Sequence, residues 1–251
     1  MPPDLYVGVA GITTRAQADA VLAALPVGFP RRVAIGVLAS AKTLAGGERN
    51  ARSPAPDDIA GIFPSDERAI NLVHYFTRTT GDGLASELHA ARGVGGHHCH
   101  GLQINIAWPD PIELRAFASS TTRCARIVLQ LGPAALEAVS FDAEGIADRL
   151  VPYMDSGVID DVLLDASGGV GRPMSLPWIS ECVAVIREAF PELGITIAGG
   201  LSPVCLPERA LLASVSIDVE SGVRDAFDAL HPGKVRAFLD GVYGLLLPGG
   251  A

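Results

Sequence analysis

Asp161-Val-Leu-Leu-Asp165 is an apolar, strand-like run that leads into the glycine-rich segment Ala-Ser-Gly-Gly-Val-Gly171. Two similar runs follow it: Ile195-Thr-Ile-Ala198 before Gly-Gly-Leu201, and Val215-Ser-Ile-Asp-Val219 before Glu-Ser-Gly-Val223. Glycine turns let backbone N–H groups approach an anion closely, and the N-terminus of a following helix adds a favourable dipole. We therefore expect a carboxylate and two anion-binding turns to lie together on one rim of a parallel sheet.

Eight apolar runs of strand length alternate with helix-length segments along the whole chain. Runs that are apolar throughout are typical of parallel strands covered by helices, and the 251 residues match the roughly 250 of one (β/α)8 barrel. We predict an α/β fold, a closed TIM barrel forming a single domain over residues 1–251, rather than an open doubly wound sheet. The predicted strands are residues 5–9, 33–39, 72–77, 101–105, 126–131, 160–165, 195–198 and 215–219. The predicted helices are residues 14–25, 56–62, 84–92, 111–119, 143–154, 177–190, 207–213 and 232–245.

Composition and charge narrow the class of partner. The chain is 49% hydrophobic and 19% charged, as globular proteins are, and its net charge of −9 argues against nucleic acid and against an anionic membrane surface. We find no signal-peptide pattern and no apolar run long enough to span a membrane. The four cysteines form no CxxC pair, so we expect reduced thiols in a cytoplasmic protein. They are Cys99, Cys124, Cys182 and Cys205.

One connection is long enough to cover a site. Residues 40–55 follow the second predicted strand and therefore start at the C-terminal rim, where the active sites of barrels lie. A structureless loop longer than about 12–15 residues is usually functional or mobile. We expect either a lid over the site or a disordered surface insertion.

The segment His97-His98-Cys99-His100 carries side chains that suit zinc. It precedes the fourth predicted strand, so it belongs to the N-terminal face of a barrel, which serves stability. Successive residues of a strand also point in opposite directions and do not all reach one ion. We predict no metal site.

Several fragments form an ordered set that matches one known family. Val9-Ala-Gly-Ile-Thr13 is similar to that family's C-G-I-T at the end of the first strand, and Leu102-Gln-Ile-Asn105 is similar to its V-Q-L-H. Two further matches lie in the middle of the chain: Ala51-Arg-Ser-Pro54 is similar to S-x-R, and Leu163-Leu-Asp-Ala166 with Gly168-Gly-Val-Gly-Arg172 and Trp178 is similar to L-L-D followed by G-G-x-G-K-x-x-x-W. Two more lie near its end: Ala198-Gly-Gly-Leu-Ser-Pro203 is similar to S-G-G-L-x-P, and Ile217-Asp-Val-Glu-Ser-Gly-Val223 is similar to V-D-V-S-S-G-V. The whole set resembles the phosphoribosylanthranilate isomerase family of the tryptophan pathway.

This resemblance implies an Amadori rearrangement, in which an aminoaldose phosphate becomes an aminoketose phosphate. An acid opens the sugar ring to an iminium, and a base removes the C2 proton. The two groups must face each other across the barrel mouth with pKa values near neutrality. By the resemblance, Asp165 is the general acid.

The position of the base departs from the family. The family's cysteine at the end of the first strand is replaced by Ala10 here, and a methyl group accepts no proton. The histidine of the family's fourth-strand motif is replaced by Asn105, which we expect to bind the substrate. Asp218 matches a family aspartate near the substrate amine and is the best candidate for a replacement base. Three explanations stay open: a different base, chemistry that needs only the acid, or an engineered inactivation at Ala10.

The resemblance also assigns the positions that bind the substrate. Arg52 is expected to pair bidentately with a substrate carboxylate, with Arg49 as a competitor for that role. Glu220 replaces a family serine at the phosphate turn, where a carboxylate repels phosphate unless its side chain points away. The backbone cradle for phosphate is expected at Gly199, Gly200, Ser221 and Gly222.

We interpret the chain as an isomerase that acts on a small phosphorylated ribosyl-amine, without a cofactor, as a monomer or a homodimer. Two alternatives remain. One is a diverged barrel that performs lyase or condensation chemistry on another phosphosugar, and the other is a non-catalytic barrel that binds a phospholigand. Asp165 favours an enzyme, because a pure binding protein needs no acid at a strand tip.

Overall fold

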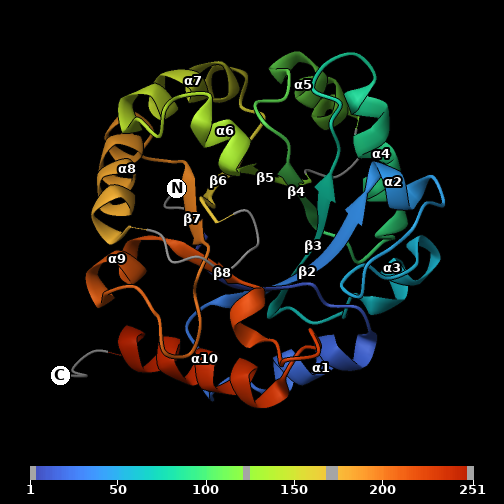
Figure 1. Cartoon of the computed structure of the whole chain (residues 1–251), viewed down its shortest axis with the longest axis vertical. Coiled ribbons are helices and arrows are strands. Elements are labelled where there is room, and N and C mark those ends of the chain that lie inside the picture. The colour runs from blue at the N-terminus through green and yellow to red at the C-terminus, as the bar shows by residue number, and fades with distance from the viewer. Residues whose placement is uncertain (1–3, 121–124, 168–174, 248–251) are drawn as a thin grey trace.

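The computed structural model describes residues 4–120, 125–167 and 175–247, which form a closed barrel of eight parallel strands (Figure 1). Neighbouring strands pair in sequence order, and β8 pairs with β1 to close the ring. The predicted closed (β/α)8 barrel is confirmed, whereas the motif Gly168-Gly-Val-Gly-Arg172 lies outside the described residues. The strands are β1 Tyr6–Ala10, β2 Arg32–Ser40, β3 Ala69–Phe76, β4 Gly101–Asn105, β5 Arg126–Leu131, β6 Asp161–Leu164, β7 Gly194–Ala198 and β8 Ser216–Val219.

Helices surround the barrel and bury their apolar faces against the strands (Figure 1). They are α1 Arg15–Ala23, α2 Ala41–Leu44, α3 Pro56–Ile62, α4 Leu84–Val94, α5 Pro111–Ser120, α6 Pro133–Glu137, α7 Ala143–Ser156, α8 Leu176–Ala189, α9 Arg209–Ser214, the 3-10 helix η1 Ser221–Val223 and α10 Pro232–Leu246.

The short helix α2 corrects the expectation that residues 40–55 lack secondary structure throughout. The Ser40 hydroxyl accepts a hydrogen bond from Thr43 N (3.1 Å), and Thr43 Oγ1 accepts one from Ser40 N (2.9 Å). This reciprocal pair is a capping box, which satisfies N–H groups that have no partner within the first helical turn. The polypeptide therefore leaves β2 as one ordered helical turn before the remainder of the connection.

Polar side chains fill the N-terminal end of the barrel interior. Arg126 donates two hydrogen bonds to the buried carboxylate of Asp161, at 2.7 and 2.8 Å. Its guanidinium also lies 5.0 Å from the centre of the Tyr6 ring, whose hydroxyl accepts a hydrogen bond from Thr196 (2.9 Å). An apolar layer that includes Ile70, Leu72, Val128 and Leu163 lies next along the axis. A cavity is therefore open only toward the C-terminal rim.

The histidine-rich segment before β4 is used in packing. The Nδ1 atom of His100 accepts a hydrogen bond from Asn71 N (2.8 Å), and the Asn71 amide donates one to His98 O (2.8 Å). Within the described ranges, no group of three or more His, Cys, Asp or Glu side chains is arranged to hold a metal ion. No helix in the same ranges is long and apolar enough to cross a membrane.

Candidate active site

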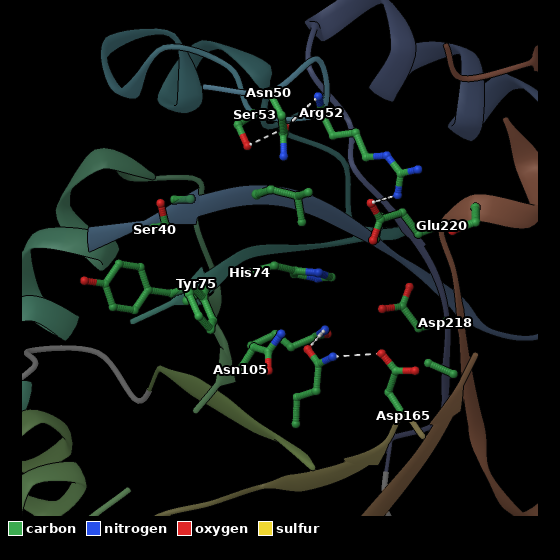
Figure 2. Close-up of a pocket in the computed structure, with 18 of the residues that line it drawn as sticks. Ser40, Asn50, Arg52, Ser53, His74, Tyr75, Asn105, Asp165, Asp218 and Glu220 are labelled. Carbon is green, nitrogen blue, oxygen red and sulfur yellow. Dashed lines mark hydrogen bonds and ion pairs between the residues drawn. The ribbon is translucent and has the colours of Figure 1, made fainter. Parts of the chain in front are cut away.

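A cavity of about 790 Å³ opens at the C-terminal ends of the strands (Figure 2). Loops that follow β2, β7 and β8 form its walls, and strand ends form its floor. The cavity also borders Arg49 and Glu220. All nine residues predicted for the site line it: Ala10, Arg52, Asn105, Asp165, Gly199, Gly200, Asp218, Ser221 and Gly222. Their roles stay predictions, but their convergence makes one shared site geometrically possible.

Asp165 follows β6 and is held in place by hydrogen-bond donors. Its Oδ1 accepts from the Ser167 amide (3.0 Å) and the Ser167 hydroxyl (2.6 Å), while Oδ2 accepts from Gln130 Nε2 (3.1 Å). Gln130 in turn accepts a hydrogen bond from Gln103 Nε2 (3.1 Å), so side chains from three adjacent strands form a relay. An ionised carboxylate only accepts hydrogen bonds, and this arrangement of donors suits that form.

Asp218 has the opposite environment. It is buried on β8, beside Gly8, where a Cβ would lie 2.4 Å from the Asp218 Oδ1 atom. That oxygen has no hydrogen-bond partner among the described residues. Burial, followed by the nearby charges of Glu220 and Asp165, raises the pKa of Asp218 to about 8. A pKa near 8 favours the protonated form of Asp218 at neutral pH.

Ala10 ends β1 with its methyl group against the cavity, and a histidine lies next to it. A Cβ placed on Gly36 would meet the His74 atoms Cε1 and Nε2 at 2.5 Å and the Ala10 Cα at 3.1 Å. The bare Gly36 therefore leaves room for the imidazole beside Ala10. Burial lowers the pKa of His74 to about 3, so the ring is neutral at physiological pH.

His74 is a cavity residue that the sequence reasoning missed. It lies within an apolar strand, where a single histidine resembles a core residue. The available signal was the alternation of side chains along a strand: Leu72 packs inside the barrel, so His74, two residues later, also faces the interior.

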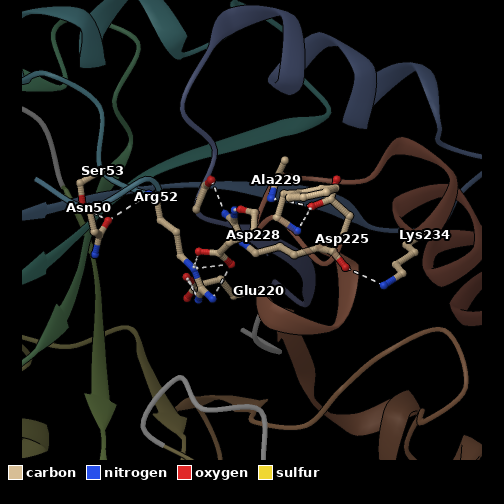
Figure 3. Close-up of polar contacts among 11 residues, drawn as sticks. Asn50, Arg52, Ser53, Glu220, Asp225, Asp228, Ala229 and Lys234 are labelled. Atoms are coloured by element: carbon tan, nitrogen blue, oxygen red, sulfur yellow. Dashed lines mark hydrogen bonds and ion pairs between the residues drawn. The ribbon is translucent and has the colours of Figure 1, made fainter.

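Arg52 is fully engaged by two carboxylates (Figure 3). Its Nε and Nη2 atoms donate to Asp228 at 2.7 to 3.0 Å, and Nη1 donates to Glu220 Oε1 (2.8 Å). These partners raise the pKa of Arg52, with the Asp228 hydrogen bond as the largest cause. Glu220 is thus paired with a cation, which reduces the repulsion expected for an unpaired carboxylate beside a phosphate site. Arg224, which donates to Asp228 O (2.6 Å) and Gly11 O (2.5 Å), supports the same turn.

Because of these ion pairs, Arg52 ties the connection after β2 to the turn after β8. We predict that Arg52→Ala accelerates amide hydrogen exchange in residues 45–55, since the connection loses its charged attachment. Arg68→Ala is a matched control, because the Arg68 side chain donates only to the nearby Asp66 in the described structure. Equal exchange in the two variants would show that Arg52 does not hold the connection.

The turns after β7 and β8 pack closely against each other. Gly199 and Gly200 have φ values of 96° and 70°, in the left-handed region that favours glycine. A Cβ on Gly222 would lie 1.9 Å from Leu201 O, so this contact requires a glycine. The Gly200 and Gly222 amides donate none of the backbone hydrogen bonds found outside regular elements in the described residues. We therefore keep both amides as the predicted anion-binding groups at the rim.

Comparison with known proteins shows that solved structures share the fold of nearly the whole chain. No protein-family model and no curated protein sequence matches the chain. Among solved structures, phosphoribosylanthranilate isomerase from Thermotoga maritima is 17% identical, with a TM-score of 0.66 over 96% of this chain and 99% of that one. The Thermus thermophilus enzyme is 18% identical, with a TM-score of 0.64 over 96% and 100%. A third structure holds reduced 1-(o-carboxyphenylamino)-1-deoxyribulose 5-phosphate and is 16% identical, with a TM-score of 0.63 over 96% and 99%. The chain shares the fold of these isomerases over nearly its full length.

Proposed function

We propose that this chain is a phosphoribosylanthranilate isomerase-like enzyme, which converts a phosphorylated ribosyl-amine from its aldose to its ketose form. The observation that carries this proposal is the pairing of a protonated carboxyl, Asp218, with a hydrogen-bonded carboxylate, Asp165, in one cavity. An Amadori rearrangement needs a proton donor for the ring oxygen, and a nearby negative charge stabilises the iminium that forms. The bound reduced aminoketose phosphate in one structural neighbour supports the same class of substrate.

In the proposed reaction, the Asp218 carboxyl proton passes to the ring oxygen as the C1–O bond breaks. The amine lone pair then forms the C1=N bond of an iminium. A base removes the C2 proton, the C–H electron pair forms the C1=C2 bond, and the C1=N pair returns to nitrogen. The enaminol becomes the aminoketose when the base returns its proton to C1 and the 2-hydroxyl proton restores Asp218. No proton is gained or lost overall.

In this scheme Asp218 starts with a proton and Asp165 starts without one, which is the reverse of the roles expected from the sequence. Asp165, expected as the acid, accepts three hydrogen bonds and serves as a fixed negative charge that stabilises the iminium. Asp218, expected as a replacement base, starts with the proton. The phosphate group of the substrate is held by the glycine turns after β7 and β8, through the Gly200 and Gly222 amides.

Purified protein tests this function with two measurements. Turnover of phosphoribosylanthranilate reports isomerisation, and calorimetry with reduced 1-(o-carboxyphenylamino)-1-deoxyribulose 5-phosphate reports binding. We predict that Asp165→Asn lowers kcat by about 10²- to 10⁴-fold, the range expected for loss of a group acting in the transition state, while the analogue still binds. Glu48→Gln is the control, because it removes a cavity carboxylate whose partner is the exposed Lys42.

The other outcomes identify the alternatives. Binding of the analogue without turnover would favour a non-catalytic phospholigand-binding barrel. Absence of both binding and turnover would reject this substrate class and favour different chemistry on another phosphosugar.

A further inference from the structure

The cavity lacks a thiol at the position where the phosphoribosylanthranilate isomerase family has its cysteine. Ala10 presents a methyl group there, and no described cysteine replaces it. Cys99 and Cys182 are buried elsewhere, whereas Cys205 is exposed and does not line the cavity. Removal of a C2 proton therefore needs a different acceptor.

Asp165 and His74 are the two candidate acceptors that we compare, because the other cavity carboxylates, Glu48 and Glu220, form ion pairs with Lys42 and Arg52. Both oxygens of Asp165 already accept hydrogen bonds, so a proton there would displace a donor from Gln130 or Ser167. The His74 ring has no hydrogen-bond or charge partner in the described parts of the chain, since burial alone perturbs its pKa. Its ring projects from β3 toward the side of the cavity that holds the two aspartates (Figure 2).

His74 also lies close to the position of the missing thiol. A Cβ at Gly36 would lie 2.5 Å from the His74 Nε2 atom and 3.1 Å from the Ala10 Cα, so the imidazole edge packs over Gly36 beside position 10. A proton acceptor at this point reaches nearly the same part of a bound sugar as a side chain at position 10. The neutral imidazole has one nitrogen that accepts a proton.

We propose that His74 is the general base that takes the place of the missing thiol, a role that rests on the proposed isomerase function. Its unprotonated ring nitrogen takes the C2 proton, and the C–H electron pair forms the C1=C2 bond of the enaminol. The imidazolium then returns this proton to C1. Ring opening by Asp218 precedes this step, so each of the two side chains regains its starting state in every cycle.

The residues packed directly against His74 carry no charge. Ala10, Gly36, Leu38 and Gln103 pack next to His74 from β1, β2 and β4, and none of these is titratable. The titratable groups that share the cavity are Glu48, Tyr75, Asp165, Asp218 and Glu220, along with the cationic Lys42, Arg49 and Arg52.

The first variant is His74→Gln, which keeps a polar side chain but accepts no proton at neutral pH. We expect kcat for phosphoribosylanthranilate to fall by about 10²- to 10⁴-fold, with the affinity for the reduced aminoketose phosphate within about threefold of wild type. His97→Gln is the matched control, because His97 is exposed before β4, at the opposite end of the barrel. Its kcat should be unchanged.

The second variant adds Ala10→Cys to His74→Gln. A thiolate beside the empty position should restore kcat at least roughly tenfold, and the rate should rise with pH toward the thiol pKa of about 8.5. A merely structural His74 would give no such rescue and no new pH dependence. Undiminished turnover in His74→Gln would overturn this role and leave the isomerase function standing. A wild-type chain that binds the analogue but turns nothing over would refute the function itself, and His74 as its base with it.

Discussion

Asp218→Asn should abolish isomerase turnover and, in the same protein, raise the free energy of unfolding at neutral pH. The amide cannot donate a carboxyl proton, so kcat should fall by about 10²- to 10⁴-fold. The buried Oδ1 of Asp218 has no partner within the described residues, and Glu220 and Asp165 lie near it. A neutral amide removes the cost of placing an acid in this position. Loss of activity with a gain in stability would mark a residue retained for chemistry.

The pH dependence of stability follows from the raised pKa of Asp218. The unfolded carboxyl ionises near its ordinary pKa of 3.8, whereas the folded one keeps its proton up to about pH 8. Between these values the folded state binds more protons, so the Asp218 contribution to stability falls as pH rises. Each unit of pKa difference corresponds to about 1.4 kcal/mol, so the gain in Asp218→Asn is on the order of a few kcal/mol at pH 8. Thermal unfolding at pH 5 and pH 8 measures it, with the exposed Asp148→Asn on α7 as control.

The pH dependence of activity separates the two possible roles of Asp218. As a proton donor, it must be protonated, so kcat/KM should be retained at neutral pH and decline above about pH 8. The groups that face it are Gln103 on β4, Asp165 after β6 and Glu220 after β8, with Gly8 on β1. If kcat/KM instead increased above pH 8, Asp218 would act as the base that the resemblance suggested.

The barrel and its carboxyl-bearing rim could be predicted because each depends on local patterns. Parallel strands buried on both faces are apolar throughout, and Asp165 and Asp218 occur where such runs end. The glycine turns were also visible, because Gly199 and Gly200 adopt backbone angles that other residues rarely tolerate. Each of these signals lies within a few consecutive residues.

The features of the site that could not be predicted depend on neighbours that are distant in sequence. The proton on Asp218 follows from burial and from charges on other strands. The engagement of Arg52 follows from Asp228, which is 176 residues away and has a φ of 62° in a loop. His74 becomes relevant only because Gly36 and Ala10 leave space on the two strands before it. A single sequence carries no pattern for such contacts.

The turn that contains Gly222 combines the closest packing at the rim with the expected anion site. A Cβ there would lie 1.9 Å from Leu201 O, so any side chain must push η1 away from the turn after β7. An aspartate would also place a negative charge beside the amides that we propose bind the phosphate. The neighbouring Glu220 is already paired with Arg52.

Gly222→Asp should therefore weaken binding of the reduced aminoketose phosphate by at least a hundredfold, about 2.7 kcal/mol, and Gly222→Ala by less. The alanine variant measures the displacement of the turn, and the difference between the two variants measures the charge. Gly61→Ala is the control for a glycine substitution, because a Cβ at Gly61 on α3 meets nothing within 4 Å. Calorimetry with this analogue and with inorganic phosphate separates the phosphate contribution from the rest of the ligand. If both Gly222 variants bound inorganic phosphate as wild type does, the phosphate would have to lie elsewhere in the cavity, and Lys42 and Arg49 on its wall would become the next groups to test.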